Sequence, residues 1–228
     1  METKLKSVLK NPILRLTFKS FLFGLLLVAT NPVIFFIGAF LLYARPLFRT
    51  LEFLIPLLAL LPIASISSSL LQDTYYFWPA IGYLSFLFLI LLGIKDLVLV
   101  KRIFWESVLR LGLAYASFLV FFYYSQSYFL ASLILLFLFI LFLLRFSLKQ
   151  RVFYWAIAFL LLEGVWAISL LPVGFISSAT LALLVFWTLT SLALDYSRNK
   201  QSKKFLLLAI SLFIILSIIV LGFSRWSL

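Results

Sequence analysis

The chain has no cysteine and no histidine, and only 11% of its 228 residues are charged. These absences exclude disulfide bonds, thiol catalysis, zinc sites built from Cys and His, haem ligation by His, and general-base chemistry by His. A soluble domain carries about a quarter charged residues, because its surface faces water. With 65% hydrophobic residues and a mean hydropathy of +1.22, this chain cannot cover a globule with polar groups. The composition therefore excludes a soluble globular fold and predicts a polytopic membrane protein.

The charges that remain are strongly unbalanced. Seven acidic residues face nineteen Lys and Arg, which gives a formal net charge of +12. The basic residues stand in short loops between apolar runs, a pattern typical of membrane orientation and of attraction to anionic lipid headgroups at the cytoplasmic face. The sequence holds no phosphate-binding loop, dinucleotide fingerprint or metalloprotease motif. We therefore expect no cofactor, no metal and no nucleic-acid partner, and we expect membrane lipids and proteins within the membrane as partners.

Eight continuous apolar runs cover most of the chain. About 20 helical residues span the roughly 30 Å of a bilayer's hydrocarbon core, and most of the runs have that length. None alternates between apolar and polar residues as a barrel strand would, so we predict an all-α membrane bundle. The runs are Ser20–Tyr43, Thr50–Leu71, Tyr76–Ile94, Ile103–Tyr124, Phe129–Leu144, Val152–Leu171, Phe175–Leu194 and Phe205–Phe223.

The connections between these runs differ in their content of basic residues. Four connections hold between two and four Lys or Arg each, and the three connections that alternate with them hold none. The basic connections are residues 44–49, 95–102, 145–151 and 198–204, and those without Lys or Arg are residues 72–75, 125–128 and 172–174. Because Lys and Arg are retained in cytoplasmic loops, this alternation places the basic connections in the cytoplasm.

The first run is interrupted by Asn31-Pro32, a dipeptide typical of a turn or a helix end. If the run crossed the membrane once, 12 basic residues would lie inside and 6 outside; if it turned back at this dipeptide, the division would be 17 inside and 1 outside. The positive-inside rule favours the second arrangement. We therefore predict a helical hairpin over about residues 12–48 with Asn31-Pro32 at its tip. A re-entrant hairpin and a single helix kinked at Pro32 stay open as alternatives.

The predicted architecture is this hairpin followed by seven transmembrane helices. Residues 1–228 form a single membrane domain without a soluble domain, and residues 1–19, with five basic residues, form a cytoplasmic interfacial segment. The N-terminus is expected in the cytoplasm and the C-terminus outside. In a bacterium, the membrane would be the inner, cytoplasmic one.

Glu163 is the polar residue that most needs an explanation. It lies in the middle of the run Val152–Leu171, where a carboxylate costs several kcal/mol unless it is protonated, paired or hydrated. Helical spacing places Phe159, Trp166 and Leu170 on its side of the helix, and the adjacent Gly164 permits close approach of another helix. Two interpretations stay open: a group that handles protons, cations or a polar substrate, and a buried acid bonded to a neighbouring helix.

Two further places are candidates for function. Asp73 is the only acid predicted on the outer face, where it could belong to an outward-facing polar vestibule with Glu163 at its floor. Glu106 and Arg110 are spaced i, i+4 at the cytoplasmic start of a helix, a spacing that favours an ion pair at the membrane boundary. Arg110 could instead contact a lipid headgroup or a phosphate. We predict no catalytic residue.

Three functions are compatible with these features. The first is a non-enzymatic integral membrane subunit or scaffold of an envelope-associated assembly, which needs the fewest special assumptions. The second is a small transporter or flippase-like carrier that uses Glu163, supported by the helix-breaking Pro56 and Pro62. The third is a membrane-embedded enzyme that modifies lipids or glycans, which requires Asp73 or Glu163 to converge with an Arg or Tyr. Whether the chain is an enzyme stays open, with the non-enzymatic interpretation favoured.

Overall fold

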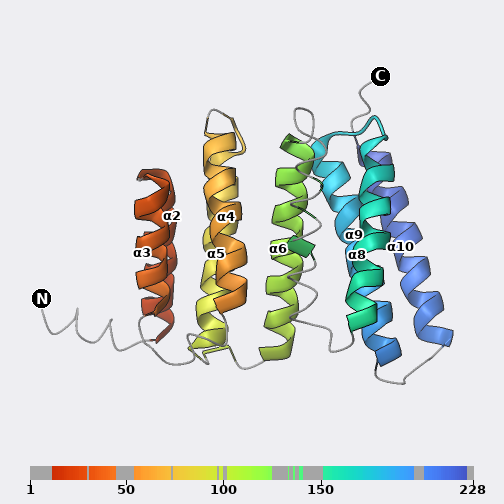
Figure 1. Ribbon diagram of the computed structural model, residues 1–228, viewed down its shortest axis with the longest axis horizontal. Coiled ribbons are helices and arrows are strands. Elements are labelled where there is room, and N and C mark those ends of the chain that lie inside the picture. The colour runs from red at the N-terminus through yellow and green to blue at the C-terminus, as the bar shows by residue number, and fades with distance from the viewer. Residues whose placement is uncertain are drawn as a thin grey trace, which may run out of the picture. The chain divides into compact units, whose positions relative to one another are not determined.

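The computed structural model describes residues 12–29, 31–44, 54–72, 74–96, 98–99, 102–124, 133, 136, 139–140, 151–197 and 203–224. Within these residues it contains eight helices and no strand (Figure 1). The helices are α2 (Pro12–Ala29), α3 (Pro32–Ala44), α4 (Leu54–Leu71), α5 (Phe77–Lys95), α6 (Arg102–Tyr124), α8 (Arg151–Ser169), α9 (Phe175–Ser197) and α10 (Lys203–Phe223).

The helices follow the predicted apolar runs closely. Three of those in the described residues are long and apolar enough to cross a membrane, over Phe77–Lys95, Arg102–Tyr124 and Phe175–Leu194. An all-helical fold with helices of membrane-spanning length is therefore confirmed for the residues that the structure describes. The run Phe129–Leu144 lies largely outside the described residues, although the few positions described within it are helical.

The first run forms two helices that meet at Asn31. α2 ends at Ala29 and α3 begins at Pro32, so the chain breaks at the predicted dipeptide. The Asn31 side chain accepts a hydrogen bond from the Val33 backbone N–H at 3.1 Å, as an N-cap residue does, and Pro32 takes the first helical position, where its missing N–H removes no helical bond. The two arms pack against each other, which Figure 1 shows as adjacent helices. A single helix kinked at Pro32 is therefore not what the chain adopts.

The prolines of α4 do not divide it. Pro56 lies in the first turn, where a proline removes no hydrogen bond, and the helix continues through Pro62 in its interior. The second run is thus one helix that continues through its interior proline, and the discontinuous helix considered as an alternative is not formed.

The chain folds as two compact units, residues 1–113 and residues 114–228. In the first unit α5 packs against both α2 and α4, and α3 packs against α2 and α4. In the second unit α9 packs against both α8 and α10. α5 and α9 are therefore the central helices of their units, which agrees with the many buried side chains along α5.

Small residues and stacked rings join α2 to α5. Phe23 and Phe88 are wholly buried and stack with their ring centroids 4.2 Å apart. The Ser20 hydroxyl donates to the Ser85 carbonyl at 2.6 Å, and a Cβ added at Gly24 would lie 2.7 Å from the Ser85 hydroxyl oxygen. Ser20 and Gly24 therefore let the two backbones approach closely, as small residues spaced by four do between membrane helices.

Candidate functional site

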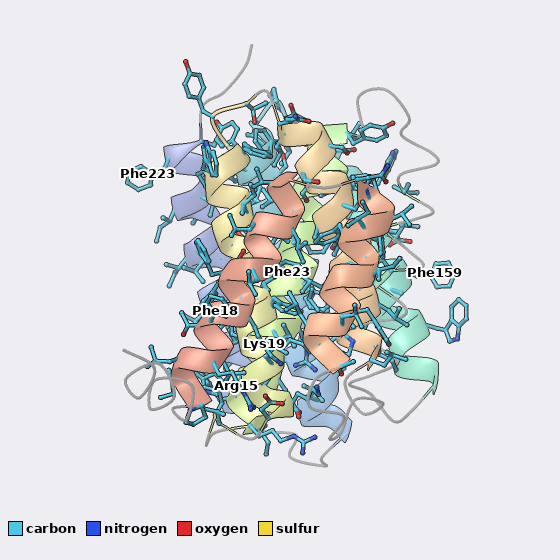
Figure 2. The ribbon with its side chains drawn as sticks, turned by 90° about the vertical axis from the view of Figure 1, so that its left-hand side faces the viewer. Arg15, Phe18, Lys19, Phe23, Phe159 and Phe223 are labelled. Atoms are coloured by element: carbon cyan, nitrogen blue, oxygen red, sulfur yellow. The ribbon has the colours of Figure 1, made fainter. Side chains whose placement is uncertain are left out.

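Glu163 lies on the exposed side of α8. We call this side the α8 outer face and define it by the exposed residues Trp155, Ala156, Phe159, Leu160, Glu163, Trp166 and Ala167. Trp166 is 55% exposed and Phe159 is 54% exposed, and Figure 2 shows the Phe159 ring projecting away from the helices. Leu170, just beyond the helix, is also exposed. The predicted grouping of Glu163 with these apolar residues is therefore present, and it faces outward.

The opposite side of α8 packs into the second unit. Leu161 and Val165 are wholly buried, and they stand on the far side of the helix from Glu163. A Cβ added at Gly164 would lie 3.4 Å from a methyl group of Val185 in α9, so Gly164 stands in the contact between the two helices. The packing of α8 on α9 thus fixes the direction in which Glu163 points.

The Glu163 carboxylate has no hydrogen bond and no ion pair with any residue that the structure describes. An ionised carboxylate at the middle of a membrane helix costs about 3 kcal/mol unless a partner or water compensates it. A buried acid satisfied by a neighbouring helix is therefore not what the described residues show. What the α8 outer face offers is one strong hydrogen-bonding group surrounded by apolar side chains.

A cavity in the first unit is lined in part by Pro32, one of the two residues predicted to break the first run. It has a volume of about 350 Å³ and lies where the hairpin tip meets the C-terminal end of α4. Among the described residues its lining has no charged side chain, and it consists of Leu27, Val28, Pro32, Phe35, Ser65, Ile66, Ser68, Ser69, Gln72 and Phe77. Asp73 lies outside the described residues, so the predicted vestibule between Asp73 and Glu163 stays a prediction.

Glu106 pairs with the residue one turn before it. Nε of Arg102 donates to Oε1 of Glu106 at 2.7 Å, and both side chains are about one third exposed. Arg110, the predicted partner, lies on the following turn, and its buried Nε has no hydrogen-bond partner among the described residues. Both pairs have the i, i+4 spacing, and the order acid before base favours Glu106–Arg110, but the structure forms Arg102–Glu106.

A second charged site joins three helices of the first unit, and the sequence analysis did not find it. We call it the Asp96 cluster and define it by Arg15, Lys19, Lys95 and Asp96. Arg15 Nη2 lies 3.3 Å from Asp96 Oδ2. Figure 2 shows Arg15 and Lys19 near the N-terminal end of α2, with Phe23 further along the same helix.

The two lysines of the cluster bind the C-terminal end of α3. Lys19 Nζ donates to the Leu42 carbonyl at 3.0 Å. Lys95 Nζ donates to the Tyr43 carbonyl and lies 4.6 Å from the centre of the Tyr43 ring. The last carbonyls of a helix lack intrahelical donors and carry the negative end of its dipole, so the two ammonium groups stabilise the end of α3. Sequence reasoning treated these residues as separate boundary charges, because no local spacing connects α2, α3 and α5.

No known protein indicates a function for these sites. No protein-family model, no curated protein and no solved structure matches this chain. The described residues also contain no group of three or more Asp or Glu side chains able to hold a metal ion. The positions of Glu163 and of the Asp96 cluster are therefore the observations from which a function is inferred.

Proposed function

We propose that the chain is a non-enzymatic integral membrane subunit of an envelope-associated assembly, and that the α8 outer face is where a partner packs. The observation that carries this proposal is the exposed Glu163 carboxylate, which has no partner among the described residues and stands on an otherwise apolar face. A partner that supplies a donor there removes the cost of an unpaired acid in hydrocarbon. The exposed aromatic side chains around Glu163 supply the contact area.

The partner is a transmembrane helix of a different protein, bearing a Lys, an Arg or another strong hydrogen-bond donor at the depth of Glu163. Charge complementarity favours this choice. A second copy of the chain, packed by twofold symmetry through the same face, would bring Glu163 against Glu163 and place two acids together without a cation. A basic partner residue satisfies the carboxylate and fixes the position of the two helices along each other.

The other two functions receive less support from the described residues. A carrier that uses Glu163 would need this residue in a hydrated cavity, whereas Glu163 lies among exposed apolar side chains of α8. An enzyme would need Glu163 to converge with an Arg or a Tyr, and Glu163 has no such contact within the described part of the chain. Asp73, the other acid proposed for this role, lies outside the described residues.

The topology of the proposed subunit is a fully spanning hairpin followed by seven transmembrane helices. Its support is the break at Asn31-Pro32, the antiparallel arms of α2 and α3, and the alternation of basic connections along the sequence. The N-terminus then lies in the cytoplasm and the C-terminus outside.

Photocrosslinking in native membranes tests the proposed function. A photoreactive phenylalanine derivative replaces Trp166 on the α8 outer face or, as a matched control, Ile214, which is 50% exposed on α10 of the same unit. The expected result is a crosslink from position 166 to one membrane protein, with a Lys or Arg in the crosslinked helix. This crosslink is lost in Glu163→Leu and is absent from position 214.

Two outcomes would contradict the proposal. If positions 166 and 214 crosslinked to the same proteins with the same yield, the crosslinks would reflect crowding in the membrane and not a specific partner of the α8 outer face. A crosslinked species that contains two copies of this chain would show that the α8 outer face binds a second copy of the chain and not a different protein.

A further inference from the structure

A stripe of polar residues runs along the C-terminal end of α4. Ser65, Ser68 and Ser69 are followed by Gln72 in the turn after the helix, and their spacing of i, i+3, i+4 and i+7 is that of one helix face. All four residues line the cavity of about 350 Å³ where the hairpin meets α4. The preceding part of α4, Leu54–Ala64, is apolar, so the polar groups of this helix gather at the end where the cavity lies.

The polar stripe has hydrogen-bonding capacity that the described residues do not use. The Ser68 hydroxyl donates to the Ser65 carbonyl at 2.9 Å. The Ser69 hydroxyl donates in the same way to the Ile66 carbonyl at 3.0 Å, and both hydroxyl oxygens can still accept a hydrogen bond. The Ser65 hydroxyl and the Gln72 amide form no hydrogen bond with any residue that the structure describes. Because polar groups in an apolar environment are costly unless they are bonded, a molecule in the cavity that supplies partners would be stabilised there.

The hairpin contributes apolar side chains to the same cavity. Leu27 in α2 and Phe35 in α3 are buried, and the Phe35 ring packs edge-on against Phe23 with centroids 5.4 Å apart. Val28 and Ile66 also line the cavity but are exposed, so apolar surface continues from the cavity to the outside of the unit. The cavity is thus formed by packed helices, and its volume falls within the roughly 300–1,000 Å³ of ligand pockets.

The cavity lies at the ends of helices. The hairpin turns at Asn31, and α4 ends at Leu71, the residue before Gln72. The ends of helices that span the hydrocarbon core lie at the level of the lipid headgroups. This placement rests on the spanning topology proposed above. A lipid at this depth can set its headgroup against the polar stripe, while its acyl chains leave the cavity past Val28 and Ile66.

We infer that the first unit binds a lipid with an uncharged, hydroxylated headgroup, such as a glycosyl diacylglycerol, in the cavity between the hairpin and α4. Hydroxyl and amide groups both donate and accept hydrogen bonds, so they match the hydroxyls of such a headgroup. The described lining holds no charged side chain that would favour a phosphate. This site is independent of the α8 outer face, which belongs to the other unit.

Photocrosslinking in nanodiscs tests the inference on the full chain. The nanodiscs contain a monoglucosyl diacylglycerol, phosphatidylcholine or phosphatidylglycerol, each with a diazirine near the start of one acyl chain. The glucolipid is expected to crosslink most strongly, and to residues 27–35 and 65–77. Ser69→Leu, which places a larger apolar side chain in the cavity, should lower this crosslink about tenfold. Gln72→Leu should lower it about fivefold, the effect of losing one neutral hydrogen bond.

A matched variant separates binding from a general effect of the substitution. Ser211 in α10 is exposed like Ser69, and its hydroxyl also donates to the carbonyl three residues earlier at 3.0 Å, but it lies in the other unit. Ser211→Leu should leave the crosslink unchanged. Unfolding in detergent checks that each variant is folded. Because Gln72 is exposed in a turn, Gln72→Leu still tests the inference if Ser69→Leu does not fold.

Four results would overturn the inference. Equal losses in Ser69→Leu and Ser211→Leu would show an effect that does not depend on the cavity. Crosslinking of the three lipids to the cavity with equal yield, or a preference there for phosphatidylglycerol, would exclude selection of an uncharged hydroxylated headgroup. Crosslinks of the glucolipid only outside residues 27–35 and 65–77 would mean that the cavity holds no lipid. Displacement of the glucolipid by an equal concentration of glucose would identify a free sugar, and not a lipid, as the ligand.

Discussion

Arg15 and Asp96 stand 81 positions apart in the chain, and Nη2 of the arginine lies 3.3 Å from Oδ2 of the aspartate. This contact ties α2, the first arm of the hairpin, to the C-terminal end of the central helix α5. Because the Asp96 side chain is nearly buried, its removal leaves the Arg15 guanidinium without the carboxylate that it contacts.

The first prediction concerns this acid. Asp96→Ala should lower the free energy of unfolding by about 2 kcal/mol, since it breaks an ion pair whose carboxylate is largely buried. Glu106→Ala, which breaks the more exposed pair with Arg102, should cost less than about 1 kcal/mol. Chemical unfolding in mild detergent measures both values. If both variants lost the same free energy of unfolding, the burial of Asp96 would make no contribution to stability.

Close helix contact at Gly112 leads to a second prediction. The Tyr83 hydroxyl donates to the Gly112 carbonyl at 2.8 Å, and a Cβ added at Gly112 would collide with the Leu87 side chain. Gly112→Val should therefore destabilise the protein by about 2 kcal/mol through overpacking. Gly82→Val is the control, because no atom lies within 4 Å of a Cβ added there. Thermal unfolding compares the two, and similar midpoints would contradict the close contact.

The helix cap at the hairpin tip gives a third prediction. Asn31→Ala removes the side-chain oxygen that accepts the Val33 N–H and should cost about 1 kcal/mol. Asn31→Asp keeps an acceptor at the same position and should retain most of the stability. If the aspartate and alanine variants lost the same amount in detergent unfolding, the hydrogen bond at the tip would not contribute.

A fourth prediction separates stability from assembly at Glu163. Glu163→Leu should leave the free energy of unfolding of the isolated protein unchanged or raise it, because it makes apolar an exposed acid that has no partner in the described part of the chain. Leu161→Ala, on the buried side of the same helix, should cost about 3 kcal/mol. Unfolding in bilayers compares the variants. A large loss in Glu163→Leu would mean that the acid holds the unit together.

The topology gives a fifth prediction, and the absence of cysteine makes it direct. Single cysteines replace Lys10, Tyr75 or Lys149, and a membrane-impermeant thiol reagent is applied to intact cells. Tyr75→Cys should react, whereas Lys10→Cys and Lys149→Cys should react only after the cells are opened. Reaction of Lys10→Cys from outside would mean that the first run crosses once, and reaction of Lys149→Cys would reverse the orientation.

The sequence alone determined where the helices lie. Apolar runs of membrane-spanning length and the local chemistry of Asn31-Pro32 act within one segment, so α2, α3 and the helices after them begin and end close to the predicted residues. The grouping of Glu163 with Phe159 and Trp166 was predictable for the same reason, because helical spacing sets it. The sequence did not predict that Glu106 pairs with Arg102 and not with Arg110, since both arginines stand one turn away from it.

Only the tertiary structure decided which side of each helix is buried. In a soluble protein the polar side of a helix marks the surface, but in lipid both sides are apolar, and periodicity does not distinguish a packed side from an exposed one. For this reason the sequence did not predict that Glu163 is exposed. That became clear only from the way α8 packs on α9. The Asp96 cluster required tertiary structure for a different reason: its members come from separate helices, and only folding brings Arg15 to Asp96 and Lys95 to the end of α3.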